Sequence, residues 1–180
     1  GGAKVGPMLE PSLPEPEPAR HSLAGFTLNS ADATADFARA LAPLLGPGDT
    51  LCLEGDLGAG KTHFARAVIQ ARLAEYGAVE DVPSPSFTLV QTYQAGDLEI
   101  WHSDLYRLTA PQEMDELGLS DAFETSLCLI EWPGRMGREM PDAALWLTLT
   151  MQPERGVRHL RITSARPDAW RARLAGILPV

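Results

Sequence analysis

Lysine is almost absent from this chain. Its fifteen basic residues comprise two lysines, Lys4 and Lys61, and therefore thirteen arginines. Arginine thus meets the ordinary need for positive charge, and the body of the chain keeps one ammonium group, that of Lys61. An ammonium is a compact, strongly hydrated point charge that suits a phosphate site. The residues around Lys61 are therefore the first candidates for a binding motif.

Long apolar runs are absent as well. No stretch approaches the roughly 20 apolar residues that span a bilayer, and the N-terminal segment lacks the apolar core of a signal peptide. We therefore expect a cytoplasmic protein with no membrane partner. The two cysteines, Cys52 and Cys128, lie in apolar, strand-like runs. Two such thiols form no disulfide framework, and we expect both to be reduced core residues.

Basic residues are outnumbered by acidic ones. The net charge is −9 and the isoelectric point is about 4.8. Binding to nucleic acid is driven by basic side chains that neutralise phosphates, so this balance argues against DNA and against a broad RNA-binding surface. Where RNA is involved, we expect a protein partner to hold it.

Residues 55–62, which read GDLGAGKT, fit the pattern G-x-x-x-x-G-K-[ST]. They follow the apolar run 50–53 and precede an amphipathic segment at 64–71, which is the strand, loop and helix context of a P-loop. Such a loop turns its backbone N–H groups around a β-phosphate at the start of a helix. We expect Lys61 to reach the β- and γ-phosphates and the Thr62 hydroxyl to ligate Mg²⁺.

The length of the chain favours one domain, because 180 residues hold one full core and are too few for two ordinary ones. We expect an α/β P-loop NTPase domain over residues 22–180, in three layers with a mixed central sheet. Residues 1–21 are rich in proline and glutamate and have little to bury, which predicts a disordered leader. Folded structure is expected from about Phe26, followed by a helix capped by Asn29 or Ser30.

Apolar runs, alternating patterns and prolines predict the later elements. These are strands at 88–93, 98–102 and 127–130, a helix capped by Thr109, a C-terminal antiparallel hairpin within 145–162, and a last helix around Trp170.

Two carboxylates, Asp104 and Glu131, follow strand-like runs. A site that hydrolyses a nucleoside triphosphate needs carboxylates beside the P-loop, to hold Mg²⁺ through its water shell and to orient the attacking water. Glu131 ends the most apolar run in the chain, where an unpaired carboxylate is costly, so a metal partner is favoured. Residues 84–88 place hydroxyls, including that of Ser86, on a backbone stiffened by proline, as suits a loop that senses the γ-phosphate. Surface acids at strand ends and an ordinary Ser-Pro loop remain open as alternatives.

Taken together, these pieces resemble one family. Residues 55–62, 84–90, 102–108 and 131–133, in this order, are similar to the motifs of the bacterial TsaE (formerly YjeE) ATPases of tRNA threonylcarbamoyladenosine biosynthesis. The resemblance covers about residues 22–165, and the joint pattern is far more specific than the P-loop alone. It implies a weak, Mg-dependent ATPase whose hydrolysis resets a tRNA-modifying complex. A TsaD–TsaB-like heterodimer is the implied protein partner, with tRNA involved only indirectly.

The resemblance also implies roles for particular residues. Lys61, Asp104 and Glu131 are expected to be catalytic, and Thr62, Glu131 and Asp104 to form the Mg²⁺ site. Trp132 is expected near the nucleotide or the partner, with a packed core indole as the alternative. The expected nucleotide-binding residues are Asp56, Gly58, Ala59, Gly60, Lys61, Thr62, His63, Ser30, Ser86, Trp132, Arg155 and Gly156.

Three positions depart from the family pattern. Ser86 stands where threonine is usual, which keeps the hydroxyl. Gly134 replaces an acidic residue that often follows Glu-Trp-Pro, so any role of that acid is absent here. His63 stands where threonine or serine is commoner, which indicates a choice on the helix surface.

Other functions share parts of the pattern. A GTPase needs an Asn/Thr-Lys-x-Asp element to read guanine, and the body has no lysine outside the P-loop, so this class is excluded. A small-molecule kinase stays open, because Arg135 and Arg138 are placed to clamp a transferred phosphoryl group. No insertion that would form an acceptor pocket is evident, however. A module that binds ATP without productive turnover, and orders its loop against a partner, also stays open.

Overall fold

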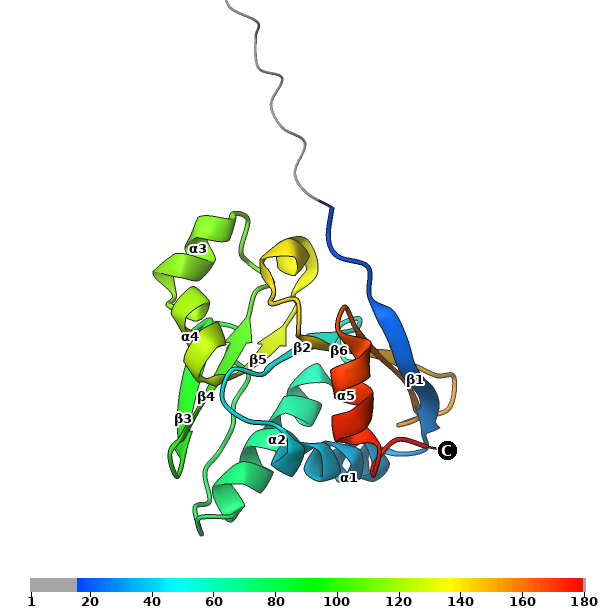
Figure 1. The fold of residues 1–180 in the computed structure, drawn as a ribbon. Helices are drawn as coiled ribbons and strands as arrows, with labels where there is room; N and C mark the ends of the chain where they lie inside the picture. The colour runs from blue at the N-terminus through cyan, green and yellow to red at the C-terminus, as the bar shows by residue number, and fades with distance from the viewer. Residues whose placement is uncertain (1–15, 180) are drawn as a thin grey trace, which may run out of the picture.

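A mixed sheet of seven strands organises the part of the chain that the structure, a computed structural model, describes: residues 16–179 (Figure 1). The four central strands run parallel, and the two strands at one edge and the single strand at the other pair antiparallel with their neighbours. This confirms the predicted mixed sheet and C-terminal hairpin. In order across the sheet the strands are β1 (His21–Leu28), β7 (Arg158–Ser164), β6 (Leu145–Met151), β2 (Thr50–Glu54), β5 (Leu127–Glu131), β4 (Leu98–Asp104) and β3 (Val90–Ala95).

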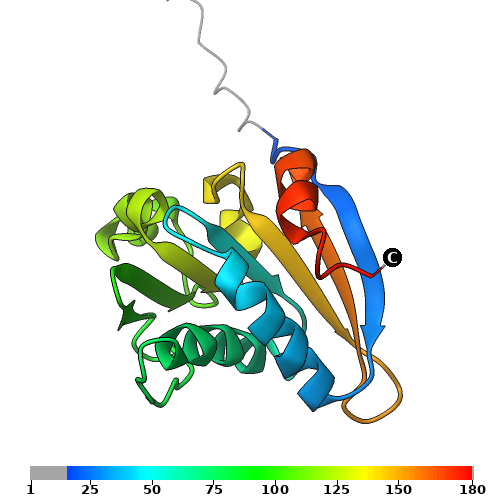
Figure 2. The same cartoon turned by 60° about the horizontal axis from the view of Figure 1, so that its bottom comes forward.

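Helices cover both faces of the sheet, which gives the three expected layers (Figures 1 and 2). On one face lie α1 (Ala31–Leu41), the 3₁₀ helix η1 (Ala42–Leu44), α2 (Lys61–Ala74) and α5 (Pro167–Leu174). On the other face lie α3 (Pro111–Glu116), α4 (Leu119–Thr125) and the 3₁₀ helix η2 (Gly134–Glu139). No helix within residues 16–179 is long and apolar enough to cross a membrane.

Each face of the sheet has its own apolar core. Along β6, Leu145, Leu147 and Leu149 pack under α1 and α2, whereas Trp146 packs with Ile130 on the other face. This alternation follows from the two-residue period of a strand. All five residues of β5 are buried, as its continuous apolar run predicted. Burying one leucine side chain fully stabilises the fold by about 1.5–3 kcal/mol, so these strands anchor the sheet.

The first strand begins earlier than the sequence indicated. β1 starts at His21 instead of near Phe26, because it pairs with β7 along its whole length, a contact between distant parts of the chain. Just before it, Arg20 Nη1 lies 2.7 Å from Glu54 Oε1, and the Arg20 guanidinium stacks 3.9 Å from the ring centroid of Trp146. The last residues of the predicted leader therefore contact the sheet. Residues 1–15 lie outside the described part of the chain.

Two local expectations were wrong in detail, and one helix was not predicted. The residue that precedes α3 in extended conformation is Ala110 and not Thr109, whose hydroxyl donates to Glu113 instead. Gly118, with φ of 86°, ends that helix and begins α4, which the sequence pattern had not revealed. β3 begins at Val90 and not at residue 88, because Leu89 has a left-handed φ of 66° that interrupts the strand.

The two cysteines provide a test of the core. Both Cys52 and Cys128 are free and fully buried, and burial raises the pKa of each thiol, that of Cys128 to about 12. At about pH 8 the reactive thiolate is therefore suppressed. We expect native protein to give no measurable reaction with Ellman's reagent, and unfolded protein in guanidinium chloride to release two equivalents. Rapid reaction of one thiol in the native protein would contradict this packing.

Candidate nucleotide-binding site

The P-loop connects the end of β2 to the start of α2 and packs tightly against β6. A Cβ atom added to Gly55 would lie 2.5 Å from the carbonyl oxygen of Leu149, so only glycine fits here. Gly55 also has φ of 150°, and Gly60, at the N-terminus of α2, has φ of 106°. Backbone in these regions favours glycine, which is why the motif requires glycine at both positions.

The ammonium group of Lys61 is buried inside this loop. The residue is 5% exposed, and its Nζ donates to the carbonyls of Gly55 at 2.5 Å and Asp56 at 3.0 Å. Its Nζ also lies 3.8 Å from the centroid of the Trp132 ring, a cation–π contact. Burial lowers the pKa of Lys61, and the nearby carboxylates of Glu131, Asp104 and Asp56 oppose that shift. The protein thus keeps a partly desolvated cation among acceptors, where a phosphate would bind it strongly.

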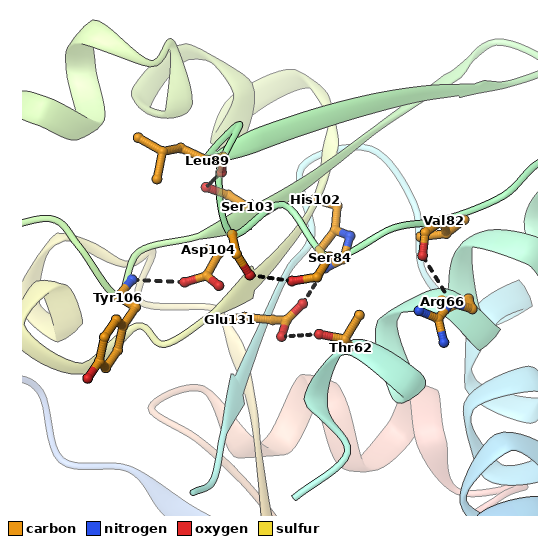
Figure 3. A network of polar contacts seen from close by, with 11 residues as sticks. Thr62, Arg66, Val82, Ser84, Leu89, His102, Ser103, Asp104, Tyr106 and Glu131 are labelled. Atoms are coloured by element: carbon orange, nitrogen blue, oxygen red, sulfur yellow. Dashed lines mark hydrogen bonds and ion pairs between the residues drawn. The ribbon is translucent and has the colours of Figure 1, made fainter. Parts of the chain in front are cut away.

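Glu131 lies at the centre of a buried polar network (Figure 3). It is 2% exposed; its Oε1 accepts a hydrogen bond from Thr62 Oγ1 at 2.7 Å, and its Oε2 lies 2.5 Å from Nε2 of His102. Because a carboxylate only accepts, the imidazole donates through Nε2. Both oxygens of the carboxylate are therefore held in fixed directions.

Asp104 ends β4 directly beside Glu131, its partner in the parallel register with β5. Its Oδ1 accepts the N–H of Tyr106 at 2.9 Å, and the residue is largely buried. Its own N–H, together with the hydroxyl of Ser103, donates to the carbonyl of Leu89. These two bonds attach the end of the Ser-Pro loop, at Leu89 with its left-handed φ of 66°, to the strand that carries Asp104.

These elements enclose a cavity of about 220 Å³. Two further hollows, of about 290 and 340 Å³, adjoin it at Trp132, which lines all three. Trp132 has a left-handed φ of 54°, an uncommon conformation that concentrates at functional sites. The 220 Å³ cavity is lined by Leu57, Gly58, Gly60, Lys61, Thr62, His63, Ser84, Ser86, Asp104, Glu131 and Trp132. The structure therefore brings together most of the predicted catalytic, metal and phosphate residues.

A second group of predicted residues meets at the start of α1. Ser30 caps this helix by accepting the N–H of Ala33 at 3.0 Å, and a Cβ added to Gly156 would lie 3.9 Å from Ser30 Cα. From α2, His63 Nε2 lies 3.0 Å from the carbonyl of Ala31. Ser30, Gly156 and His63 thus lie together at the start of α1, and His63 also lines the 220 Å³ cavity.

The remaining predicted residues do not line the cavity with their side chains. Arg155 is exposed in the turn between β6 and β7. Ala59 is buried, and the carbonyl of Asp56 accepts the Ala59 N–H at 3.0 Å within the loop.

Two residues at the site were missed by the sequence interpretation. His102, wholly buried, binds Glu131, and Arg158 donates to the P-loop carbonyls of Gly58 and Ala59. A signal for Arg158 was present, because it lies two residues before Leu160 and so shares the face of β7 that carries the inward-facing apolar residues. His102 likewise shares a face of β4 with Asp104, which is a weaker signal.

The donor set fits Mg²⁺. Thr62, Glu131 and Asp104 offer oxygen ligands, which this cation prefers, and it needs only one or two carboxylates besides phosphate and water. Within the described residues no cluster of three or more His, Cys, Asp or Glu side chains has the geometry of an all-protein metal cage. A site completed by phosphate oxygens suits the residues that are present.

Comparisons with known proteins agree on one family. Residues 28–160 match the family model of the threonylcarbamoyl adenosine biosynthesis protein TsaE. The chain is 40% identical to a Rickettsia bellii TsaE over 124 residues, which are 69% of this chain and 84% of that protein. It is 47% identical to a Rickettsia conorii TsaE over 106 residues, 59% of each chain, so this alignment spans less than two thirds of that relative. A crystal structure of Bacillus subtilis YdiB superposes with a TM-score of 0.69 at 26% identity, over 88% of this chain and 95% of that one.

The close approach of Gly55 to β6 can be tested against Gly58, whose φ is also positive but which has open space around it. We expect Gly58→Ala to lower the free energy of unfolding by about 1 kcal/mol, from backbone strain alone. Gly55→Ala should cost about 2 kcal/mol more, because the new methyl group overlaps the Leu149 carbonyl. Urea titrations measure both values. Equal losses for the two variants would show that the P-loop does not pack against β6 as described.

Proposed function

The chain belongs to the TsaE family of threonylcarbamoyl adenosine biosynthesis proteins, and from this premise we propose that it binds ATP with Mg²⁺ and hydrolyses the β–γ bond in support of that tRNA modification. Hydrolysis is slow in the isolated protein and is stimulated by a TsaD–TsaB-like partner complex. This partner is inferred from the resemblance of the four sequence motifs to those of the TsaE family.

One observation carries this proposal. The buried ammonium of Lys61, the Thr62–Glu131 pair and the carboxylate of Asp104 all lie around the same cavity, at the carboxyl ends of three adjacent parallel strands. Ligands of open α/β sheets bind at this end of the strands. A cation, a hydroxyl and two carboxylates are the groups that phosphoryl transfer to water requires.

Each residue has a role that its position supports. Thr62 and Glu131 would hold the metal, which, when bound, neutralises charge on the β- and γ-phosphate oxygens. The ammonium of Lys61 leaves its carbonyl partners and stabilises the negative charge that develops on the phosphate. Asp104 has one oxygen committed to the Tyr106 N–H, and its carboxylate orients the attacking water. Burial of these groups strengthens each electrostatic interaction.

The Ser-Pro loop serves as the element that senses the nucleotide. Ser84 Oγ and Ser86 Oγ lie 2.6 Å apart on the wall of the cavity. Each hydroxyl has its partner within the loop itself, so a γ-phosphate is able to compete for them. The loop ends at Leu89, whose carbonyl binds Ser103 and the N–H of Asp104. A change in the loop therefore reaches the strand that carries the water-orienting carboxylate.

The partner is expected at the mouth of this site. Three of the most exposed large apolar residues in the described chain, Leu57 at 84%, Phe87 at 85% and Tyr106 at 71%, belong to the loops around it. Leu57 and Tyr106 line the adjoining hollow of about 290 Å³ together with Arg107, whose guanidinium lies 5.0 Å from the Phe87 ring centroid. Exposed apolar side chains gathered in this way are typical of protein-binding surfaces.

Turnover tests the catalytic assignment. We expect Lys61→Ala and Asp104→Ala each to lower partner-stimulated release of inorganic phosphate from ATP at least about 100-fold, since each removes a group that acts on the transition state. Thermal unfolding serves as the control for folding. Near-normal stimulated turnover in either variant would show that its assigned role is wrong.

The same assay separates the alternatives. Transfer of the γ-phosphoryl group to a small acceptor, without release of phosphate, would identify a kinase. Tight ATP binding with no turnover, even with the partner complex, would identify a binding module that works by ordering its loop.

The partner surface can be tested with two tyrosines. Tyr106 lies at the mouth of the site, whereas Tyr76 is also exposed, at 59%, but follows the far end of α2. We expect Tyr106→Ala to raise the concentration of partner complex that gives half-maximal stimulation by about tenfold, because exposed aromatic residues are frequent hot spots. Tyr76→Ala should leave that concentration unchanged. Equal effects of the two substitutions would place the partner elsewhere.

A further inference from the structure

Arg158 joins the last strand of the fold to the P-loop. It is the first residue of β7, and its Nε donates to the carbonyl of Ala59 at 2.7 Å. Its Nη2 donates to the carbonyl of Gly58 at 3.2 Å, and its Nη1 to that of Val157 at 3.1 Å. These three hydrogen bonds all go to main-chain carbonyls, two of them in a loop about a hundred residues earlier in the chain.

The strand directs this side chain toward the loop. Leu160 and Ile162, which share a face of β7 with Arg158, are buried in the core under α1 and α2. An arginine in register with core residues is uncommon unless its polar atoms have partners. The carbonyls of Gly58 and Ala59 provide them. A Cβ atom added to Gly60 would lie 4.0 Å from Arg158 Nε, which shows how closely the side chain approaches the loop.

These bonds fix the direction of one peptide group in the loop. In a trans peptide the C=O and the following N–H point in opposite directions. When Arg158 holds the carbonyl of Ala59, the N–H of Gly60 must point away from Arg158, and Gly60 lines the cavity. Gly60 has φ of 106°, and glycine has little preference of its own between such conformations, so an external restraint decides which way this peptide faces.

We propose that Arg158 is a positioning residue that sets the P-loop in its phosphate-binding shape before nucleotide arrives. The inference rests on the proposed function, because it concerns how the same site binds the β-phosphate. Arg158 acts through the Gly60 amide and does not touch the nucleotide. Loss of Arg158 therefore weakens the binding of every nucleotide that has a β-phosphate, and weakens it to the same extent.

Binding measurements on three variants test this role. Affinities for ADP, for a non-hydrolysable ATP analogue and for AMP, each with Mg²⁺, are measured by calorimetry on the whole chain. We expect Arg158→Gln to weaken ADP and the ATP analogue equally, by about 10- to 100-fold, as for the loss of hydrogen bonds from a charged donor. Binding of AMP should change less than about threefold. Arg158→Lys, which keeps the charge but loses the fork, should give an intermediate loss.

Arg161 provides the matched control. It lies on the same strand, three residues further on, faces the opposite side of the sheet and is exposed. Arg161→Gln removes the same charge, and we expect affinities within about twofold of the unmodified chain. Hydrogen exchange gives an independent readout: exchange should accelerate in residues 55–62 of Arg158→Gln and stay unchanged in β2 and β5.

Several results would overturn the inference. One is unchanged nucleotide affinity in Arg158→Gln. Another is a loss of affinity confined to the ATP analogue, which would mean that Arg158 contacts the γ-phosphate directly. A third is faster hydrogen exchange throughout the sheet. Should Arg158→Gln fail to fold, the affinities and local exchange of Arg158→Lys decide by the same criteria. If the unmodified chain itself binds neither ADP nor the ATP analogue, the proposed function fails; if it binds both and Arg158→Gln does likewise, only the role of Arg158 fails.

Discussion

The carboxylate of Glu131, buried at the end of the central strand β5, is the group on which the arrangement of the site depends. A buried carboxylate is costly unless hydrogen bonds or charges satisfy it. Here Thr62 and His102 each hold one of its oxygens, and the ammonium of Lys61 lies in the same buried region. The three partners come from α2 and β4, so the requirement to satisfy one carboxylate fixes the P-loop helix and the neighbouring strand relative to β5.

The mixed sheet makes this arrangement possible. Parallel pairing of β2, β5 and β4 brings three carboxyl ends to one edge, where the P-loop, Glu131 and Asp104 follow one another. The antiparallel pairs toward the two edges of the sheet, β3 with β4 and β6 with β7, then complete the site from outside. β3 and β4 position the Ser-Pro loop through the carbonyl of Leu89, while β6 and β7 contact the P-loop through Leu149 and Arg158. Each half of the sheet thus restrains one of the two loops that meet at the cavity.

Much of the fold was predictable from short-range patterns. The continuous apolar run of β5, the alternation of β6 and β7 and the glycines of the P-loop each predicted the observed element. The errors lie where a distant contact decided the outcome. β1 is longer than its sequence indicated because β7 pairs with it. β3 starts later because Leu89, whose carbonyl accepts hydrogen bonds from Ser103 and Asp104, has a left-handed φ.

For the site, the residue types and their order along the chain indicated which groups we propose for the chemistry: a lysine and a hydroxyl at the start of a helix, and carboxylates at strand ends. The sequence also lacks an Asn/Thr-Lys-x-Asp element, which reads guanine in GTPases. Only the tertiary structure decided that His102 holds Glu131 and that Arg158 holds the P-loop. A local pattern indicates whether a residue faces the core or the solvent, but not which residue of a distant strand it will contact. That partner depends on strand order and register, which are set by the packing of the whole sheet.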